Sequence, residues 1–153
     1  MSRSVTFTVV GIAQPKGSTR AFVRGTRAII TSDNPKVKDW EHGIASTARL
    51  VARDGLFVGP VAVRVCFALL RPVSLPRRVV AHVRKPDLDK LVRSVGDALT
   101  GVLYRDDAQV VELHARKVYA IAGAAPSAVI TVRDAAIVEP HNPAAPWLFD
   151  VEG

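Results

Sequence analysis

Four aspartates occur as two close pairs, Asp87 and Asp89 in KPDLD and Asp106 and Asp107 in YRDDAQ, within an otherwise basic chain. The 153 residues carry a formal net charge of +7, and the sequence pI is near 10.2. Such a chain is suited to a polyanion, and clustered carboxylates weaken binding to a polyanion unless they hold a cation. The two pairs therefore predict a divalent metal that bridges carboxylates to phosphate, and nucleic acid is the expected polyanion.

Each aspartate pair also has an explanation in local structure. Asp87 follows Pro86 and precedes a predicted helix, so it could be an N-cap, and Asp89 would complement the helix dipole. Asp106 and Asp107 could form a polar turn. The helix between the pairs, of about 14 residues, spans roughly 21 Å, so spacing alone does not bring the carboxylates together.

Other metal ligands are scattered along the chain. Zinc is not expected, because there is no Cys-x-x-Cys and the histidines are far apart in sequence, at His42, His82, His114 and His141. Oxygen ligands favour Mg²⁺, for which Mn²⁺ should substitute. The single cysteine, Cys66, lies in an apolar alternating run and is expected to be a small buried side chain.

The hydrophobic pattern predicts an α+β domain with two main helices packed on a mixed sheet. Strands are predicted at 5–12, 61–70, 110–121 and 127–132, a hairpin at 20–31, and helices at 35–53 and 88–101. Asn34 should cap the first helix, with Pro35 at its first position. The strand at 61–70 should be central, and 127–132 should pair antiparallel with 110–121 across GAAP.

The predicted domain spans residues 1–133, and the proline-rich tail at 134–153 is expected to be extended or disordered. Residues 71–86 hold three prolines among basic residues and read as a long basic loop. No stretch approaches the roughly 20 apolar residues of a membrane span. We therefore expect a cytoplasmic protein with no membrane partner.

The stretch HVRKPDLDKLVRSVGDALTGVLYRDDAQVVELHARK, residues 82–117, resembles the signature of the RusA-type Holliday junction resolvases, which are crossover junction endodeoxyribonucleases. That signature is KPDxDNLxK followed by DAL, DDxQV and a lysine. The earlier AQPKGSTR, residues 13–20, resembles the less specific Pro-Lys-Gly-x-x-Arg element of the family. The order of motifs agrees over most of residues 5–133, and the tail has no counterpart.

The resemblance implies that Asp87, Asp89 and Asp107 are the catalytic carboxylates that bind the metal, with Asp106 as a supporting neighbour. It also implies a homodimer, RusA-like in fold, that places two such sites on branched DNA. A four-way junction is close to two-fold symmetric, so a symmetric dimer can cut two of its strands. A nucleoid-associated location, or the host cytoplasm for a phage-encoded protein, would follow.

Two positions depart from the family signature. Lys90 stands where the family has asparagine, and Arg93 replaces the family lysine one helical turn after Asp89. A guanidinium can stabilise a phosphate but does not exchange a proton at neutral pH. Activity should be impaired if the usual lysine is an acid or base. If that lysine acts through its charge, Arg93 should serve, unless Lys90 takes the role.

Basic residues near the motifs are candidates for DNA contact, although each could equally be an ordinary solvated charge. The candidates are Lys16, Arg20, Arg77, Arg78, Arg84, Lys85, Lys90 and Lys117. Lys117 has the better case, because it matches the family lysine and interrupts an apolar strand face.

The favoured function is a Mg²⁺-dependent endonuclease that resolves Holliday junctions in recombination, repair or phage DNA processing. One alternative is a nuclease that cuts other branched DNA. The other is a non-catalytic, basic DNA-binding protein whose site is degenerate, with Arg93 marking lost catalysis.

Overall fold

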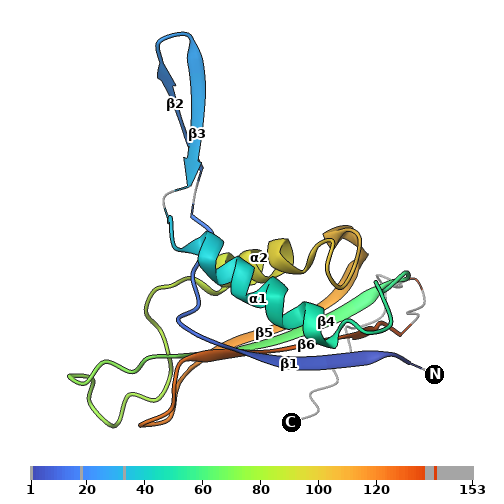
Figure 1. Ribbon diagram of the computed structural model, residues 1–153. Helices are drawn as coiled ribbons and strands as arrows, with labels where there is room; N and C mark the ends of the chain where they lie inside the picture. The colour runs from blue at the N-terminus through green and yellow to red at the C-terminus, as the bar shows by residue number, and fades with distance from the viewer. Residues whose placement is uncertain (1, 18, 33, 137–139, 141–153) are drawn as a thin grey trace.

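A mixed four-stranded sheet forms the centre of the structure, a computed structural model that describes residues 2–17, 19–32, 34–136 and 140 (Figure 1). Its strands are β1 (Ser4–Val10), β4 (Val61–Leu69), β5 (Val110–Tyr119) and β6 (Ser127–Asp134). The order across the sheet is β1-β6-β4-β5, in which only β4 and β5 run parallel. The expected α+β class with a mixed sheet and two main helices is confirmed.

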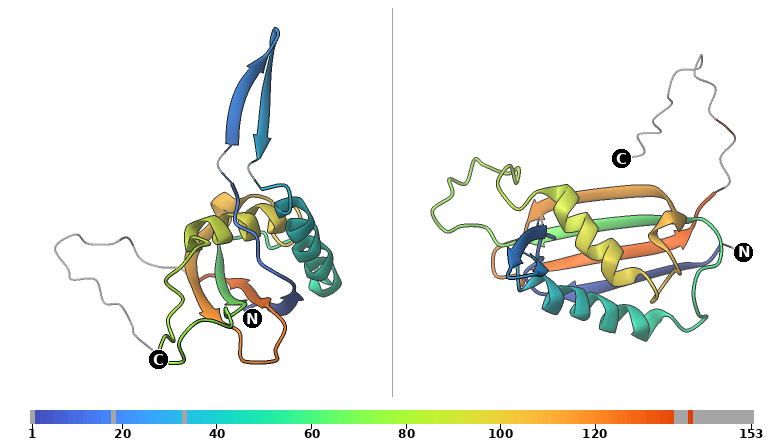
Figure 2. Two further views of the ribbon diagram at one scale, coloured as in Figure 1. Left: turned by 90° about the vertical axis from the view of Figure 1, so that its left-hand side faces the viewer. Right: turned by 90° about the horizontal axis from the view of Figure 1, so that it is seen from above.

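Two helices, α1 (Val37–Val51) and α2 (Leu88–Leu99), cover one face of this sheet (Figure 2). Each presents a stripe of buried apolar side chains at helical spacing, including Ile44 in α1 and Leu91 in α2. These stripes pack on the alternate residues of β4 that point the same way, among them Val65 and Phe67. Burial of each such side chain contributes about 1.5–3 kcal/mol, which fixes both helices on the sheet.

The first helix begins later than the sequence predicts. Lys36 occupies the N-cap position, and Val37 is the first helical residue. The Asn34 carboxamide accepts a hydrogen bond from the Lys36 N–H at 3.1 Å, while its amide group donates to Gln14 and Pro15. Asn34 therefore closes a turn before the helix and holds two chain segments together, and the expected cap at Asn34 with Pro35 inside the helix was wrong.

The predicted pairing of the last two strands was also wrong. β6 lies between β1 and β4 and is antiparallel to both, while β5 pairs with β4 on the other side. The apolar face of β6, with Ile130 and Val132 fully buried, requires a central position. β5 exposes Glu112, His114 and Arg116, which is typical of an edge strand. The burial of the apolar face of β6 therefore determined its position, although the short GAAP connection favoured pairing with β5.

The hairpin that the sequence predicts is formed by β2 (Thr19–Arg24) and β3 (Arg27–Ser32). It projects from the helices, and we call it the arm (Figure 1). Its turn contains Gly25 at a φ of 66°, a conformation that glycine adopts without strain. Strands of six residues make the arm about 20 Å long. The arm and the basic loop at 71–86 both lie near the beginning of α2 (Figures 1 and 2).

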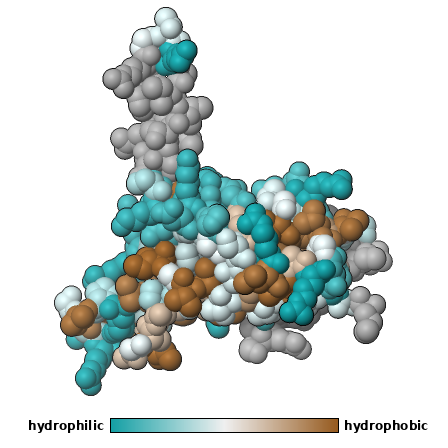
Figure 3. Space-filling model, in the orientation of Figure 1, coloured by the Kyte–Doolittle hydropathy of each residue, from teal (hydrophilic) through white to brown (hydrophobic). Residues whose placement is uncertain are grey.

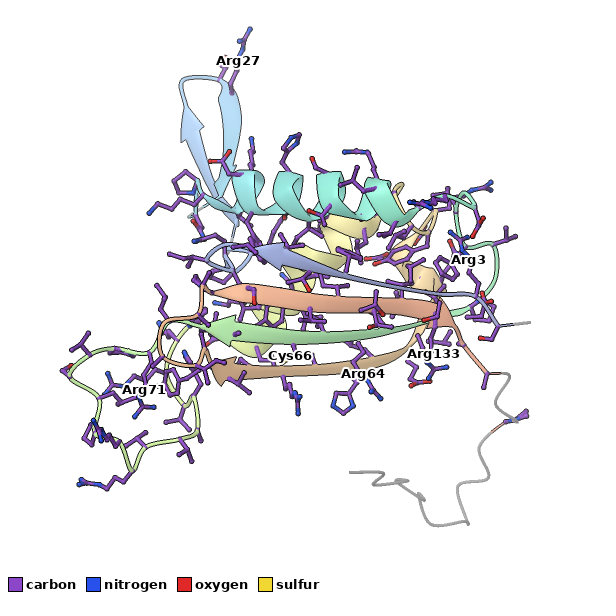
Figure 4. All side chains as sticks on the ribbon, turned by 60° about the horizontal axis from the view of Figure 1, so that its bottom comes forward. Arg3, Arg27, Arg64, Cys66, Arg71 and Arg133 are labelled. Carbon is purple, nitrogen blue, oxygen red and sulfur yellow. The ribbon has the colours of Figure 1, made fainter. Side chains whose placement is uncertain are left out.

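No described element covers the other face of the sheet, where Arg64, Cys66 and Arg133 lie (Figure 4). Cys66 is consequently half-buried, less enclosed than its apolar surroundings in the sequence suggest. Residues 137–139 and 141–153 of the predicted tail lie outside the described residues. Among the helices that are described, none is long and apolar enough to cross a membrane.

Candidate active site

Asp87 occupies the N-cap position of α2, but its carboxylate does not cap the helix. The side chain is half exposed and lies 3.7 Å from the Lys90 ammonium. Asp89 follows in the first turn and is exposed. The role of helix cap therefore does not account for the Asp87 side chain, because a capping carboxylate accepts hydrogen bonds from backbone N–H groups and this one accepts no such bond.

Asp106, in contrast, is engaged in local structure. It caps the 3₁₀ turn η1 (Asp107–Gln109), accepting a hydrogen bond from the Ala108 N–H at 2.8 Å. The Gln109 side chain completes a capping box by accepting from the Asp106 N–H at 3.1 Å. Asp107, the next residue, is exposed. The two neighbouring aspartates therefore differ: the Asp106 carboxylate stabilises the turn, and the Asp107 carboxylate is exposed to solvent.

A pocket of about 200 Å³ lies between α2 and strands β4 and β5. Its lining is mainly apolar, and its polar side chains are Arg93, Asp97, Tyr104 and Asp107. Tyr104 is almost fully buried, and burial raises the pKa of its hydroxyl, with further increases from the charges of Asp107 and Asp97. The Tyr104 hydroxyl and the carboxylates of Asp97 and Asp107 therefore belong to the same pocket, where the two negative charges disfavour ionisation of the hydroxyl.

Asp97 also belongs to an ion-pair network that sequence reasoning missed. The Lys16 ammonium lies 2.7 Å from the Asp97 carboxylate and 2.8 Å from that of Glu41 in α1. The ammonium donates a hydrogen bond to each carboxylate, and these bonds, first the one to Asp97 and then the one to Glu41, raise the pKa of Lys16. A signal was present in the sequence, since Asp89, Arg93 and Asp97 recur at intervals of four and so share one helix face.

The structure brings Arg93 and Asp107 to one pocket and leaves Asp87 and Asp89 outside its lining. Among the described residues, no three Asp, Glu, His or Cys side chains form a group that could hold a metal ion. The carboxylates are chemically suited to Mg²⁺, but they do not form a ready-made three-carboxylate site. The convergence of Asp87, Asp89 and Asp107 on one ion stays a prediction.

The candidate DNA-contact residues have different environments. Arg77, Arg78, Arg84 and Lys85 are exposed in the basic loop. Lys16 and Lys117 are half-buried, and each ammonium has protein partners. Lys90 lies beside Asp87, and the side chain of Arg20 is outside the described part of the structure. Hydrophilic residues gather over α1 and at the base of the arm (Figure 3).

A family model described as endodeoxyribonuclease RusA matches residues 13–133 of the chain. The chain belongs to the RusA family. The RusA match spans both helices, the arm and three strands of the sheet, and it confirms the resemblance found in the sequence motifs. A relative from Bacillus subtilis (strain 168), the uncharacterized protein YqaN, is 30% identical over 125 residues, covering 75% of this chain and 87% of its own. RusA membership supports a nuclease that hydrolyses DNA.

Proposed function

We propose that the chain is a Mg²⁺-dependent endonuclease that resolves four-way DNA junctions, as a homodimer, in recombination, repair or phage DNA processing. Membership of the RusA family supports the reaction class. The observation that carries the proposal to this site is Asp87, whose carboxylate sits at a helix N-cap without capping it. This carboxylate makes no cap hydrogen bond, already faces the Lys90 ammonium at 3.7 Å, and stands beside a second carboxylate at Asp89, so it is suited to hold a cation.

The cofactor proposal rests on the way proteins bind Mg²⁺. This ion is commonly held by one or two carboxylates together with water and substrate phosphate oxygens, not by an all-protein cage. Exposed carboxylates such as Asp87, Asp89 and Asp107 therefore suit an ion whose coordination is completed by DNA. Bound Mg²⁺ would supply charge neutralisation and an activated water for phosphodiester hydrolysis.

The remaining chemistry belongs to basic side chains around the aspartates. Arg93 shares a pocket with Asp107, and its planar guanidinium suits two oxygens of one phosphate. The arm and the basic loop flank the beginning of α2 (Figure 1), and Asp87 and Asp89 belong to that end of the helix, so DNA held between the arm and the loop would pass near them. A two-stranded ribbon such as the arm also fits the major groove of duplex DNA.

The test compares a synthetic four-way junction with a linear duplex of the same sequence, each incubated with Mg²⁺. Wild type should cut the junction in preference to the duplex, and Asp89→Asn should bind the junction without cutting it. Asp54→Asn is the matched control, since Asp54 is 80% exposed, follows the end of α1 and lies 4.0 Å from Arg3. That variant should cut normally.

Three results would contradict the proposal. Equal cutting of duplex and junction would indicate a general nuclease. Binding without cutting, unchanged by Asp89→Asn, would indicate a non-catalytic DNA-binding protein. Cleavage in the absence of any divalent ion would contradict the Mg²⁺ requirement.

Two further measurements are independent of activity. Electron paramagnetic resonance detects the binding of Mn²⁺ to the protein. Sedimentation of the free protein tests whether it is a dimer.

A further inference from the structure

Lys117 in β5 binds the backbone immediately before Asp87. Its ammonium donates hydrogen bonds to the carbonyl oxygens of Arg84 at 2.6 Å and Pro86 at 2.8 Å. These residues end the basic loop, and Pro86 directly precedes Asp87 at the N-cap of α2. The charge of Lys117 therefore acts on a backbone segment that has no hydrogen-bonded regular structure of its own.

The register of the sheet explains how Lys117 reaches this segment. Lys117 pairs with Phe67 of β4, whose side chain is fully buried under the helices. Lys117 thus lies on the helix-covered face of β5, at the edge of the sheet, where its stem is half-buried and its ammonium extends to the loop. Two carbonyl partners leave this ammonium one donor for other contacts.

A second contact, two residues further along β5, holds another part of the same loop. The ring of Tyr119 lies 4.5 Å from that of His82, and the guanidinium of Arg71 lies 5.1 Å from the Tyr119 ring. Arg71 also donates to the carbonyl oxygens of Val79 and Pro76, each at 2.7 Å. The end of β5 therefore anchors the basic loop at several points, and Lys117 supplies the anchor next to the aspartates.

We propose that Lys117 is a positioning residue that holds the Pro86–Asp87 backbone so that the Asp87 carboxylate lies where the reaction requires it. This inference rests on the proposed nuclease function and differs from the DNA contact expected from the sequence. Without the ammonium, two carbonyl groups lose charge-assisted hydrogen bonds and the loop end is free to shift. A displacement of about 1 Å in a catalytic group can lower a rate roughly 100-fold.

The kinetic test compares Lys117→Met, Lys117→Arg and a charge-matched control, Arg116→Met, whose side chain is exposed on the opposite face of β5. At saturating junction, Lys117→Met should cut about 10- to 100-fold more slowly, with a dissociation constant within about twofold of wild type. Lys117→Arg should recover most of the rate, because a guanidinium can donate to both carbonyls.

The opposite pattern would overturn the inference. If Lys117 contacts a DNA phosphate, Lys117→Met should weaken binding and reduce the slope of log K against log salt by about one. Its rate at saturating junction should then equal that of wild type. Arg116→Met, which removes the same charge, shows how much either quantity responds to net charge alone.

Limited trypsin digestion tests the anchor without any activity measurement. Cleavage after Arg84 should be several-fold faster in Lys117→Met than in wild type, while cleavage after Arg77 provides the internal reference. Lys117→Gln, a second variant with a side chain too short for both carbonyls, should show the same change if Lys117→Met does not fold. Unchanged cleavage after Arg84 would refute the anchor. A wild-type protein that cuts no junction would refute the nuclease proposal. The trypsin cleavage rates would then still test whether Lys117 anchors the backbone before Asp87.

Discussion

Arg93 is the residue at which this chain departs most sharply from the RusA signature, and its surroundings indicate how it can act. It lines the pocket with Asp107 and Asp97, and it lies one helical turn from Asp89. A guanidinium in that place binds phosphate oxygens and offsets the charge of nearby carboxylates. It performs no proton transfer at neutral pH. An electrostatic task is therefore the one that this geometry supports.

Substitution of Arg93 separates charge from proton transfer. We expect Arg93→Lys to cut junctions within about threefold of wild type, and Arg93→Gln to be slower by about 100-fold, the typical effect of losing one stabilising donor. Single-turnover rates from pH 6 to 9 provide the measurement. An Arg93→Lys enzyme that is much faster than wild type, with a new pH dependence, would instead show that the chain lost an acid or base.

Substitutions of Asp106 and Asp107 distinguish a carboxylate that stabilises the turn from one that is needed for catalysis. Asp106→Asn should retain both fold and activity, because an asparagine oxygen can accept from the Ala108 N–H, whereas Asp106→Ala should lose about 1 kcal/mol of stability. Asp107→Asn should fold normally and fail to cut. Thermal melting and junction cleavage distinguish these outcomes, and a folded but inactive Asp106→Asn would identify Asp106 as a metal ligand.

At the scale of elements, the base of the arm is tied to both helices. The Asn34 amide group donates to the Gln14 carboxamide at 3.0 Å, which joins the segments on either side of the hairpin. The Lys16 N–H donates to the Lys90 carbonyl at 3.0 Å, and the Lys16 ammonium binds Glu41. The arm therefore leaves the domain at a place fixed relative to the first turn of α2.

The Lys16 network should have a distinct pH dependence. Lys16→Met should lower the free energy of unfolding by on the order of 1 kcal/mol near pH 8, a modest value because all three partners are partly exposed. The folded pKa of Lys16 is raised above 10.5, so its contribution is present below that pH and is lost as pH rises through the folded value. Urea unfolding at pH 8 and pH 11.5 should show the difference between variant and wild type shrinking. A constant difference would contradict the ion-pair origin.

The elements themselves were largely readable from the sequence, but their arrangement was not. Periodicity placed α2 and the arm to within one or two residues, because both depend on local spacing and turn residues. The position of β6 depended on which strand could bury its apolar face, a property of the whole sheet. The short connection favoured pairing of β6 with β5. β6 instead lies between β1 and β4, where its apolar side chains are buried.

The site shows the same division. Asp87, Asp89 and Asp107 were proposed from the family resemblance, and their gathering on one ion stays a prediction. The structure places Arg93 and Asp107 in one pocket and leaves Asp87 and Asp89 outside its lining. Asp97 was overlooked, although its spacing from Asp89 was visible, because nothing in the sequence shows that Lys16 would reach it. Contacts between distant segments, such as that of Lys117 with Arg84 and Pro86, required the fold.

At the scale of the whole molecule, a net charge of +7 predicts salt-sensitive DNA binding. If about four phosphates are contacted, junction affinity should fall about 100-fold between 50 and 200 mM salt. Arg77→Ala and Arg78→Ala in the exposed basic loop should each reduce the salt slope by about one. Fluorescence anisotropy over a salt series measures both, and an unchanged slope would exclude the loop from the DNA interface.

Cys66 is the only cysteine in the chain, and it lies on the sheet face that α1 and α2 leave uncovered (Figure 4). A thiol-reactive fluorophore or spin label can therefore be attached to the native sequence at one defined point, with the sheet between the label and the helices. Signals from that label would report on whatever approaches this face in solution, and chemistry at the aspartates could be followed in the same sample.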